Sequence, residues 1–161
     1  AQTNLVRQLQ ARTVKREYRA IVWGQIWRNG MIDQPIGRDT RSRTKMAINR
    51  AGKPAITRYE MLERFSVQTY MRCNLETGRT HQIRVHMTHI GHPLVGDPVY
   101  LRRTPAAARS LDAPVRAALL AFPRQALHAW RIAFVHPLSE AAMELEAPVP
   151  AELAQLIATL R

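Results

Sequence analysis

The sequence predicts an α+β domain built on a mostly antiparallel sheet with flanking helices. Residues 66–76 alternate apolar and polar side chains, which is the period of a strand. From Thr80 the apolar residues Ile83, Met87 and Ile90 instead follow the helical period. The other segments are mostly strand-like, with a few short helices and no internal repeat, and this mixture is typical of the α+β class.

The composition narrows the classes of function. A chain of 161 residues can form one domain with its own core, or a large part of a bigger domain. No run approaches the ~20 apolar residues that cross a membrane, so no membrane partner is expected. A single cysteine, Cys73, cannot form an internal disulfide, which favours a cytoplasmic location. The chain begins with Ala1 rather than Met, which suggests processing or truncation.

Positive charge is the strongest bulk property of the chain. There are 24 Lys and Arg residues against 12 Asp and Glu, a net charge of +12. Most of the basic residues are Arg, whose planar guanidinium suits phosphate groups and stacks on bases. A small basic domain of this kind is typical of a nucleic-acid binder, and a basic surface that serves only solubility is the alternative.

The N-terminal region predicts a helix followed by a strand. Residues 1–12 place apolar side chains on one face of a short amphipathic helix. Residues 16–23 are rich in β-formers with apolar side chains on both faces, and Gly24 follows them. We therefore expect a strand that is covered on both sides.

The region from Arg38 to Arg58 holds the densest positive charge, with Asp39 as its one acidic residue. Residues 46–48 and 55–57 predict two strands of a basic hairpin that turns around residues 51–53. The charge favours contact with an RNA or DNA backbone, and an edge strand protected by charge is the alternative. The basic residues are Arg38, Arg41, Arg43, Lys45, Arg50, Lys53 and Arg58.

The stretch from residue 76 to residue 87 concentrates Arg, His and Gln side chains, and we take it as the functional centre. In the strand before it, odd-numbered residues are predicted to face the core and even-numbered residues to face solvent. Thr80 is the predicted N-cap of the helix that follows, and Gly91 is its predicted C′ residue.

The rest of the chain predicts a loop, an insertion and three further elements. Residues 94–100 are loop-like, and residues 101–123 are expected to form a variable surface insertion that contains a short helix after Asp112. Residues 127–135 and 143–145 predict strands, and a terminal helix begins after Pro150.

The residues exclude several kinds of site. His81, His86, His89 and His92 crowd one region, but no carboxylate or thiolate joins them in a metal-binding pattern, so no metal is expected. A metal-dependent nucleic-acid enzyme built on these histidines stays as an alternative. The chain has no nucleophile elbow and no glycine-rich phosphate loop, and we expect no cofactor.

Arg84 stands inside an otherwise packed helix and needs an anionic partner, because an unpaired buried charge is too costly. A structural ion pair with Glu76 or Asp97 is one interpretation. The other is that Arg84 orients a catalytic acid or holds a substrate phosphate.

Residues 76–87 and 89–100 together resemble the RluA/RluD-type RNA pseudouridine synthases. The similarity extends to residues 16–24, to residues 35–39 and 46–55, and to residues 125–129 with His136 and Pro137. It covers nearly the whole chain apart from residues 101–123.

The resemblance implies a reaction and the residues that take part in it. In that family a catalytic Asp attacks a flipped uridine, the glycosidic bond breaks, and the base rejoins through carbon 5 without cofactor or metal. Arg84 is expected to pair with that Asp. Tyr18 is expected to stack on the target base and assist proton removal, although a purely core role would also explain its ring. Leu94, His81 and Gln82 are expected in the substrate pocket.

The expected partner is structured RNA, with large-subunit ribosomal RNA first and transfer RNA second. The expected RNA-binding residues are Arg38, Arg43, Lys45, Lys53 and Arg79. The protein is expected to be a monomer. The alternative is a non-catalytic RNA-binding module that uses the same basic surface.

The sequence departs from the family at its nucleophile. The family carries it in a His-Arg-Leu-Asp segment upstream of the first helix, and this chain has no such segment. Its aspartates are Asp33, Asp39, Asp97 and Asp112, and none has that context. Residues 1–161 are therefore expected to be the C-terminal part of a catalytic domain that is inactive without the remaining piece.

Overall fold

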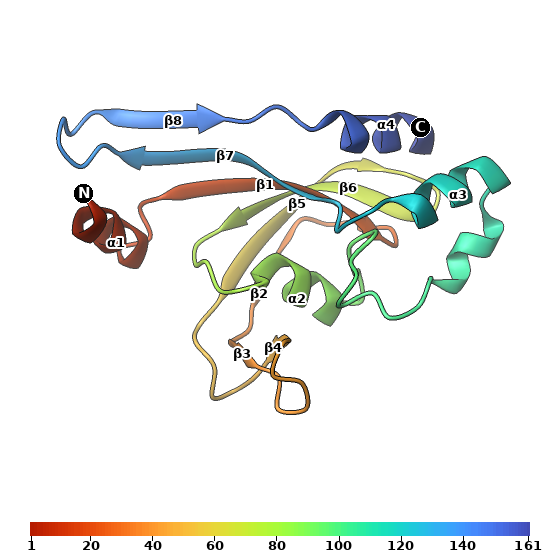
Figure 1. The fold of residues 1–161 in the computed structure, drawn as a ribbon, viewed down its shortest axis with the longest axis horizontal. Coiled ribbons are helices and arrows are strands. Elements are labelled where there is room, and N and C mark those ends of the chain that lie inside the picture. The colour runs from red at the N-terminus through yellow and green to blue at the C-terminus, as the bar shows by residue number, and fades with distance from the viewer.

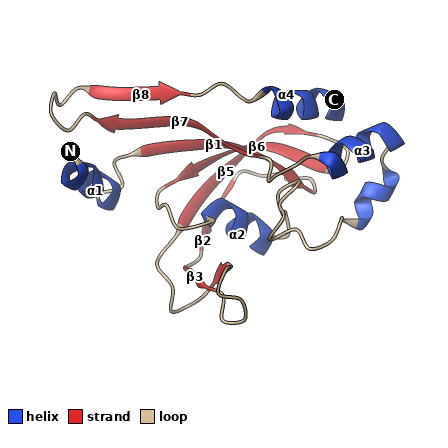
Figure 2. Ribbon diagram, viewed as in Figure 1, coloured by secondary structure: helices blue, strands red, loops and turns tan.

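The computed structural model describes all 161 residues. Its centre is a six-stranded antiparallel sheet with the strand order β2-β5-β6-β1-β7-β8, and β3 pairs with β4 in a separate small sheet (Figures 1 and 2). The strands are β1 (Lys15–Trp23), β2 (Gly30–Asp33), β3 (Ile36–Arg38), β4 (Met46–Ile48), β5 (Ile56–Arg64), β6 (Gln68–Leu75), β7 (Leu127–Val135) and β8 (Ala142–Glu146). The helices are α1 (Gln2–Gln10), α2 (Gln82–His89), the 3-10 helix η1 (Ala106–Ser110), α3 (Ala113–Ala121) and α4 (Ala151–Leu160).

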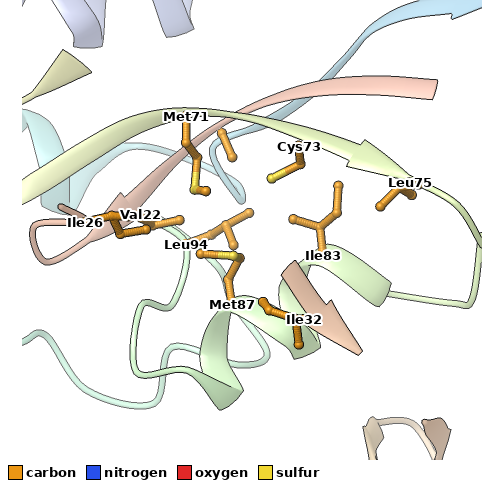
Figure 3. Packing of buried hydrophobic residues seen from close by; sticks show 10 residues of the cluster. Val22, Ile26, Ile32, Met71, Cys73, Leu75, Ile83, Met87 and Leu94 are labelled. Atoms are coloured by element: carbon orange, nitrogen blue, oxygen red, sulfur yellow. The ribbon is translucent and has the colours of Figure 1, made fainter. Parts of the chain in front are cut away.

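The central strand β1 is covered on both faces, which confirms the two-sided strand predicted from residues 16–23. It pairs with β6 on one side and β7 on the other. Ala20 and Val22 pack toward α2, where Figure 3 shows the side chains of Met71 and Met87 meeting between sheet and helix. Helix α2 is thus fixed against the sheet by a closed apolar layer.

The opposite face of the sheet is covered by η1, α3 and α4. Leu119, Leu156 and Ile157 bury there against Ile21 of β1. This second layer corrects the prediction that even-numbered residues of β6 face solvent, because Gln68 is 0% exposed. An alternating pattern identifies one buried face, but helices from later in the chain decide whether the other face is also covered.

The prediction that residues 46–48 and 55–57 pair in one hairpin is wrong. Strand β4 pairs with β3, whereas β5 pairs with β2 and β6 in the large sheet. The β3–β4 connection is closed by Asp39, whose carboxylate accepts the N–H groups of Arg41 and Ser42 at 2.7 and 3.2 Å. Such a turn supplies the local hydrogen bonds that join these two short strands. Lys53 still lies beside β3, through a bridge to Ile36.

Helix α2 begins one residue later than predicted and ends as predicted. His81, not Thr80, is the N-cap, and it adopts a left-handed conformation with φ of 56°. Gly91 has φ of +86°. The N–H of His92 donates to the carbonyl of Met87, and that of Gly91 donates to Thr88, which is a Schellman ending.

The C-terminal elements follow the sequence prediction closely. Strand β7 spans residues 127–135, β8 includes residues 143–145, and α4 follows Pro150. Residues 101–123 are folded onto the core, with Ala108 and Leu119 each 2% exposed. No helix of this chain has the length and apolar character needed to cross a membrane.

Candidate active site

A pocket of about 220 Å³ opens where β1, the end of β6 and the start of α2 meet. Tyr18 contributes its ring from β1, while His81, Gln82 and Arg84 come from the start of α2. Arg79 stands at its edge, and Leu75, Ile83, Gln125 and Leu127 complete the wall. The fold therefore gathers residues that the sequence singled out in two segments about 60 positions apart.

Arg84 is held by a buried carboxylate within the chain. Its Nε and Nη2 donate to the two oxygens of Asp97, each at 2.9 Å. Arg84 is 7% exposed and Asp97 is 2% exposed. Of the two structural partners considered from the sequence, the partner is Asp97, because Glu76 pairs with Arg58 at 2.8 Å instead. This bidentate geometry fixes the plane of the Arg84 guanidinium.

Asp97 is a support for Arg84 and is itself fully engaged. Its Oδ1 also accepts the N–H groups of Val99 and Tyr100 at 2.9 and 3.1 Å. Burial acts to raise the pKa of Asp97, but the hydrogen bonds from Arg84 and these two N–H groups outweigh it and lower that pKa. Asp97 is therefore a buried carboxylate whose hydrogen-bonding positions are already occupied by the protein.

Tyr100 connects the Arg84 guanidinium to the small sheet, and sequence reasoning missed it. Its ring centroid lies 5.1 Å from the guanidinium carbon of Arg84. Its hydroxyl shares a 2.8 Å hydrogen bond with Nδ1 of His81 and accepts the N–H of Met46 at 3.1 Å. The one sequence signal was its place three residues after Asp97 in the segment that carried the family resemblance.

Gln82 is a structural residue of the pocket wall. Its side-chain oxygen accepts the Thr77 hydroxyl at 2.7 Å and the N–H of Arg79 at 3.0 Å. Its side-chain nitrogen donates to Thr57 and to the carbonyl of Ile56, each at 3.0 Å. Gln82 thus ties the turn before α2 to β5, which sets the position of Arg79 and His81.

Two of the four histidines of this region, His86 and His92, hold parts of the fold together. His86 is 0% exposed, and its Nδ1 lies 2.7 Å from the Thr57 hydroxyl. Its Nε2 lies 2.9 Å from the carbonyl of Gln34, to which it donates. His92 contacts the carbonyl of Trp23 at 2.8 Å. The structure brings no three His, Cys, Asp or Glu side chains together in a group that could hold a metal ion.

Stability is expected to fall in acid because of His86. Burial lowers the pKa of His86 below 6.5, and this outweighs the opposing effect of the Gln34 carbonyl. The folded chain then binds fewer protons than the unfolded chain, so stability is lost as the pH falls through 6.5 toward the folded pKa. The urea midpoint should decrease over this range. His86→Gln should flatten the decrease without abolishing it, because burial also lowers the pKa of His81.

The control for this measurement is His89→Gln, which changes an exposed histidine on the same helix. It should leave most of the pH dependence in place. An identical pH dependence in wild type and His86→Gln would contradict the expected contribution of His86.

Leu94 does not line the pocket. It is 0% exposed and packs with Val22 and Met71 in the layer between sheet and α2 (Figure 3). Its backbone forms an isolated bridge with Val22. Leu94 therefore lies behind the pocket, where it supports the strand that carries Tyr18.

The predicted RNA-binding residues divide into two groups. Arg38, Lys53 and Arg79 line one groove of about 420 Å³ between the small sheet and the turn before α2. Arg43 and Lys45 lie on the β3–β4 connection outside this groove, and Arg38 donates to the carbonyl of Arg43 at 3.0 Å. A second groove of about 560 Å³ is lined by four arginines: Arg38, which also lines the first groove, Arg41 and Arg50 from the basic region 38–58, and Arg102 from outside that region.

A family model and similar curated proteins point to the same family. The family described as RNA pseudouridylate synthase matches residues 1–89. The ribosomal large subunit pseudouridine synthase D of Nitrosomonas europaea is 51% identical over 161 residues, and that of Escherichia coli (strain K12) is 48% identical. The Pseudomonas aeruginosa protein of the same name is 52% identical over 164 residues. The chain covers 45%, 49% and 50% of these proteins, so it spans about half their length.

Solved structures share the fold. Human RNA Pseudouridylate Synthase Domain Containing 1 aligns with a TM-score of 0.72 and 27% identity, over 96% of this chain and 62% of that protein. Human RNA Pseudouridylate Synthase Domain Containing 4 aligns with a TM-score of 0.74 and 22% identity, over 98% and 66%, and this likeness concerns the fold alone. The chain, matched over more than half of its residues, belongs to the RNA pseudouridylate synthase family.

Proposed function

We propose that residues 1–161 are the C-terminal part of a catalytic domain that converts specific uridines of large-subunit ribosomal RNA to pseudouridine. The observation that carries this proposal is the pocket that Tyr18 and Arg84 both line, beside a basic groove. The choice of RNA rests on the printed names of the relatives. A cytoplasmic monomer completes the proposal, and residues 101–123 are its variable insertion.

The reaction would be an isomerisation that needs no cofactor. A catalytic Asp from a segment outside these residues attacks the flipped uridine, and the N1–C1′ bond breaks. The electron pair of the broken N1–C1′ bond stays on N1. C5 of the released base then bonds to C1′ while the bond to the Asp carboxylate breaks, so the carboxylate is regenerated, C5 loses its proton and N1 gains one. Flipping brings the base into a pocket that a paired nucleotide could not reach.

Arg84 is proposed to pair with the catalytic carboxylate. Asp97 engages Nε and Nη2, and no hydrogen bond within the chain involves Nη1. Nη1 can therefore donate to a second carboxylate while Asp97 keeps the guanidinium fixed. Such preorganised positive charge stabilises an anionic nucleophile and the charge that develops on it. His81 and Gln82 form the wall beside this position, and Leu94 supports it from the core.

Mapping pseudouridine in ribosomal RNA tests the proposed function. Deleting the gene should leave one or a few large-subunit uridines unmodified, and the full-length gene should restore them. A gene that encodes only residues 1–161 should not restore them, because the nucleophile is missing. An unchanged pseudouridine pattern after deletion would instead favour the non-catalytic RNA-binding module.

The β3–β4 connection and the small sheet formed by β3 and β4 are proposed to contact the RNA backbone. Replacing Lys45 and Lys53 with Gln in the full-length protein should weaken RNA binding and lower the slope of log K against log salt by about 1 per lost phosphate contact. A matched control is Arg109→Gln with Arg116→Gln, because these residues lie on η1 and α3 at the other face of the sheet. Equal slopes in wild type and the Lys45/Lys53 variant would show that these residues do not contact RNA.

A further inference from the structure

Arg16 is a charged side chain without an anionic partner. It lies two residues before Tyr18 on β1, and no ion pair or side-chain hydrogen bond of the structure includes it. Its Nε is buried and has no hydrogen-bond partner. Neighbouring Arg12 and Arg58, by contrast, share the carboxylate of Glu76. A partly desolvated guanidinium that lacks a carboxylate is poised for an anion from outside the chain.

The turn before α2 leaves room for the Arg16 side chain because it contains Gly78. A Cβ atom on Gly78 would collide with Nη1 of Arg16. Glycine at this position therefore lets the guanidinium lie directly over the backbone of the turn. Two elements that are far apart in the sequence, β1 and the turn, thus meet at Arg16.

A second guanidinium lies in the same groove. Arg16 and Arg79 both line a hollow of about 360 Å³ between α1 and the turn before α2. Nε of Arg79 donates to the carbonyl of Pro54 at 2.9 Å, which anchors this side chain. Burial lowers the pKa of Arg16, and the positive charge of Arg79 acts in the same direction. The two cations thus border one hollow, where their like charges oppose each other.

The hollow adjoins the pocket that Tyr18 and Arg84 line. Arg79 lines both. Arg16 and Tyr18 together line a third, mostly apolar hollow beside β7. Tyr18 also lines the pocket, so Arg16 lies next to a pocket residue. A nucleotide with its base on Tyr18 would therefore carry its backbone past Arg16 and Arg79.

We propose that Arg16 and Arg79 form a phosphate-binding subsite for the RNA backbone next to the flipped uridine. This subsite rests on the proposed function, and it specifies how the substrate is held there. A phosphate accepts hydrogen bonds from two guanidinium groups at once and relieves the repulsion between them. Glu76 does not supply this anion, because Arg58 and Arg12 already engage it.

Arg16→Gln in the full-length protein should weaken RNA binding by at least about tenfold, because a charge-assisted hydrogen bond is lost. The slope of log K against log salt should fall by about 1. The single-turnover rate at saturating RNA should stay within about twofold of wild type, because Arg16 holds the backbone and does not touch the reacting atoms. Arg16→Lys should restore the salt slope and part of the affinity.

Two controls separate a local site from bulk charge and from folding. Arg109→Gln removes the same charge from an exposed residue at the other face of the sheet, and it should change the affinity little. Thermal unfolding of Arg16→Gln should resemble that of wild type, because no carboxylate of the chain loses a partner.

The decisive experiment uses stem-loop RNAs that carry the mapped uridine and a single methylphosphonate, which removes one phosphate charge. Wild type should bind more weakly when one particular phosphate beside the uridine is replaced. Arg16→Gln should bind that RNA and the unmodified RNA equally well, because its contact with this phosphate is already lost. Equal methylphosphonate profiles for the two proteins would overturn the subsite. A loss of thermal stability with an unchanged salt slope would overturn it too, since Arg16 would then pair with a protein carboxylate.

Failure of the proposed function has a different signature. If wild type binds ribosomal RNA without forming pseudouridine, the catalytic proposal fails, and so does a subsite defined by a flipped uridine. If wild type forms pseudouridine while Arg16→Gln matches its affinity and salt slope, only the subsite fails.

Discussion

Replacing Arg84 with Met in the full-length protein is expected to lower turnover at saturating RNA by about 10²–10³-fold, as loss of a preorganised charge does in other active sites. RNA affinity should stay within about threefold of wild type, because Arg84 faces the pocket and not the basic groove. Single-turnover tritium release and a filter-binding titration measure the two quantities.

Arg84 has a structural role that must be separated from the catalytic one. Its removal leaves Asp97 buried without its partner, and breaking a buried ion pair costs about 3–5 kcal/mol. Asp97→Asn keeps an oxygen for the N–H groups of Val99 and Tyr100 and removes the charge. The double variant Arg84→Met with Asp97→Asn should therefore regain at least half of the lost unfolding free energy.

Turnover in the double variant decides between the two roles. If Arg84 serves only to neutralise Asp97, activity should return together with stability. The proposed role predicts that the double variant regains stability but stays inactive, because no guanidinium remains to hold the nucleophile. Near wild-type turnover in either variant would remove Arg84 from the catalytic machinery.

Tyr18→Phe is expected to lower the rate at saturating RNA by about 10²-fold, the lower end of the usual contribution of a proton-transfer group. The ring remains able to stack, so RNA affinity should change by less than about twofold. Tyr18→Leu removes ring and hydroxyl together and should weaken binding as well, since stacking on one base contributes about 1–3 kcal/mol.

Tyr18 lies beside an irregularity of the sheet. The pairing of β1 with β7 shifts register between Glu17 and Tyr18, and the extra residue, Trp130, belongs to β7. Tyr18 also packs against the core layer beneath β1, so the ring contacts both core and pocket. Tyr70→Phe, on the opposite face, is the matched control. Wild-type turnover in Tyr18→Phe would leave the ring with stacking and packing alone.

Local signals in the sequence were enough for most elements. The alternation along β6 and the glycine at position 91 depend on neighbouring residues, so a reader of the sequence can recognise them. The partner of a short strand is a different matter. Met46–Ile48 carries no feature that distinguishes β3 from β5 as its neighbour, and the Asp39 turn that decides it is visible only once folded.

Most residues of the candidate site could be predicted from the sequence, but the ion pairs and hydrogen bonds between them could not. The motif around Arg84 showed that a buried cation needed a carboxylate, but nothing in the sequence chose between Glu76, eight residues before it, and Asp97, thirteen residues after it. Loop geometry after α2 brings Asp97 against Arg84 and carries Tyr100 beneath it. Arg16 gave no signal at all, because its unpaired state depends on where Glu76 and Gly78 lie.

The most direct test of the central claim is tritium release from large-subunit ribosomal RNA labelled at uridine C5, with full-length wild type and the Arg84→Met/Asp97→Asn variant compared under saturating protein. Formation of the C5–C1′ bond expels the C5 hydrogen, so wild type should release tritium at the mapped uridine and the variant should bind the RNA without releasing it. Wild type that binds this RNA and releases no tritium would contradict the claim that this pocket isomerises uridine.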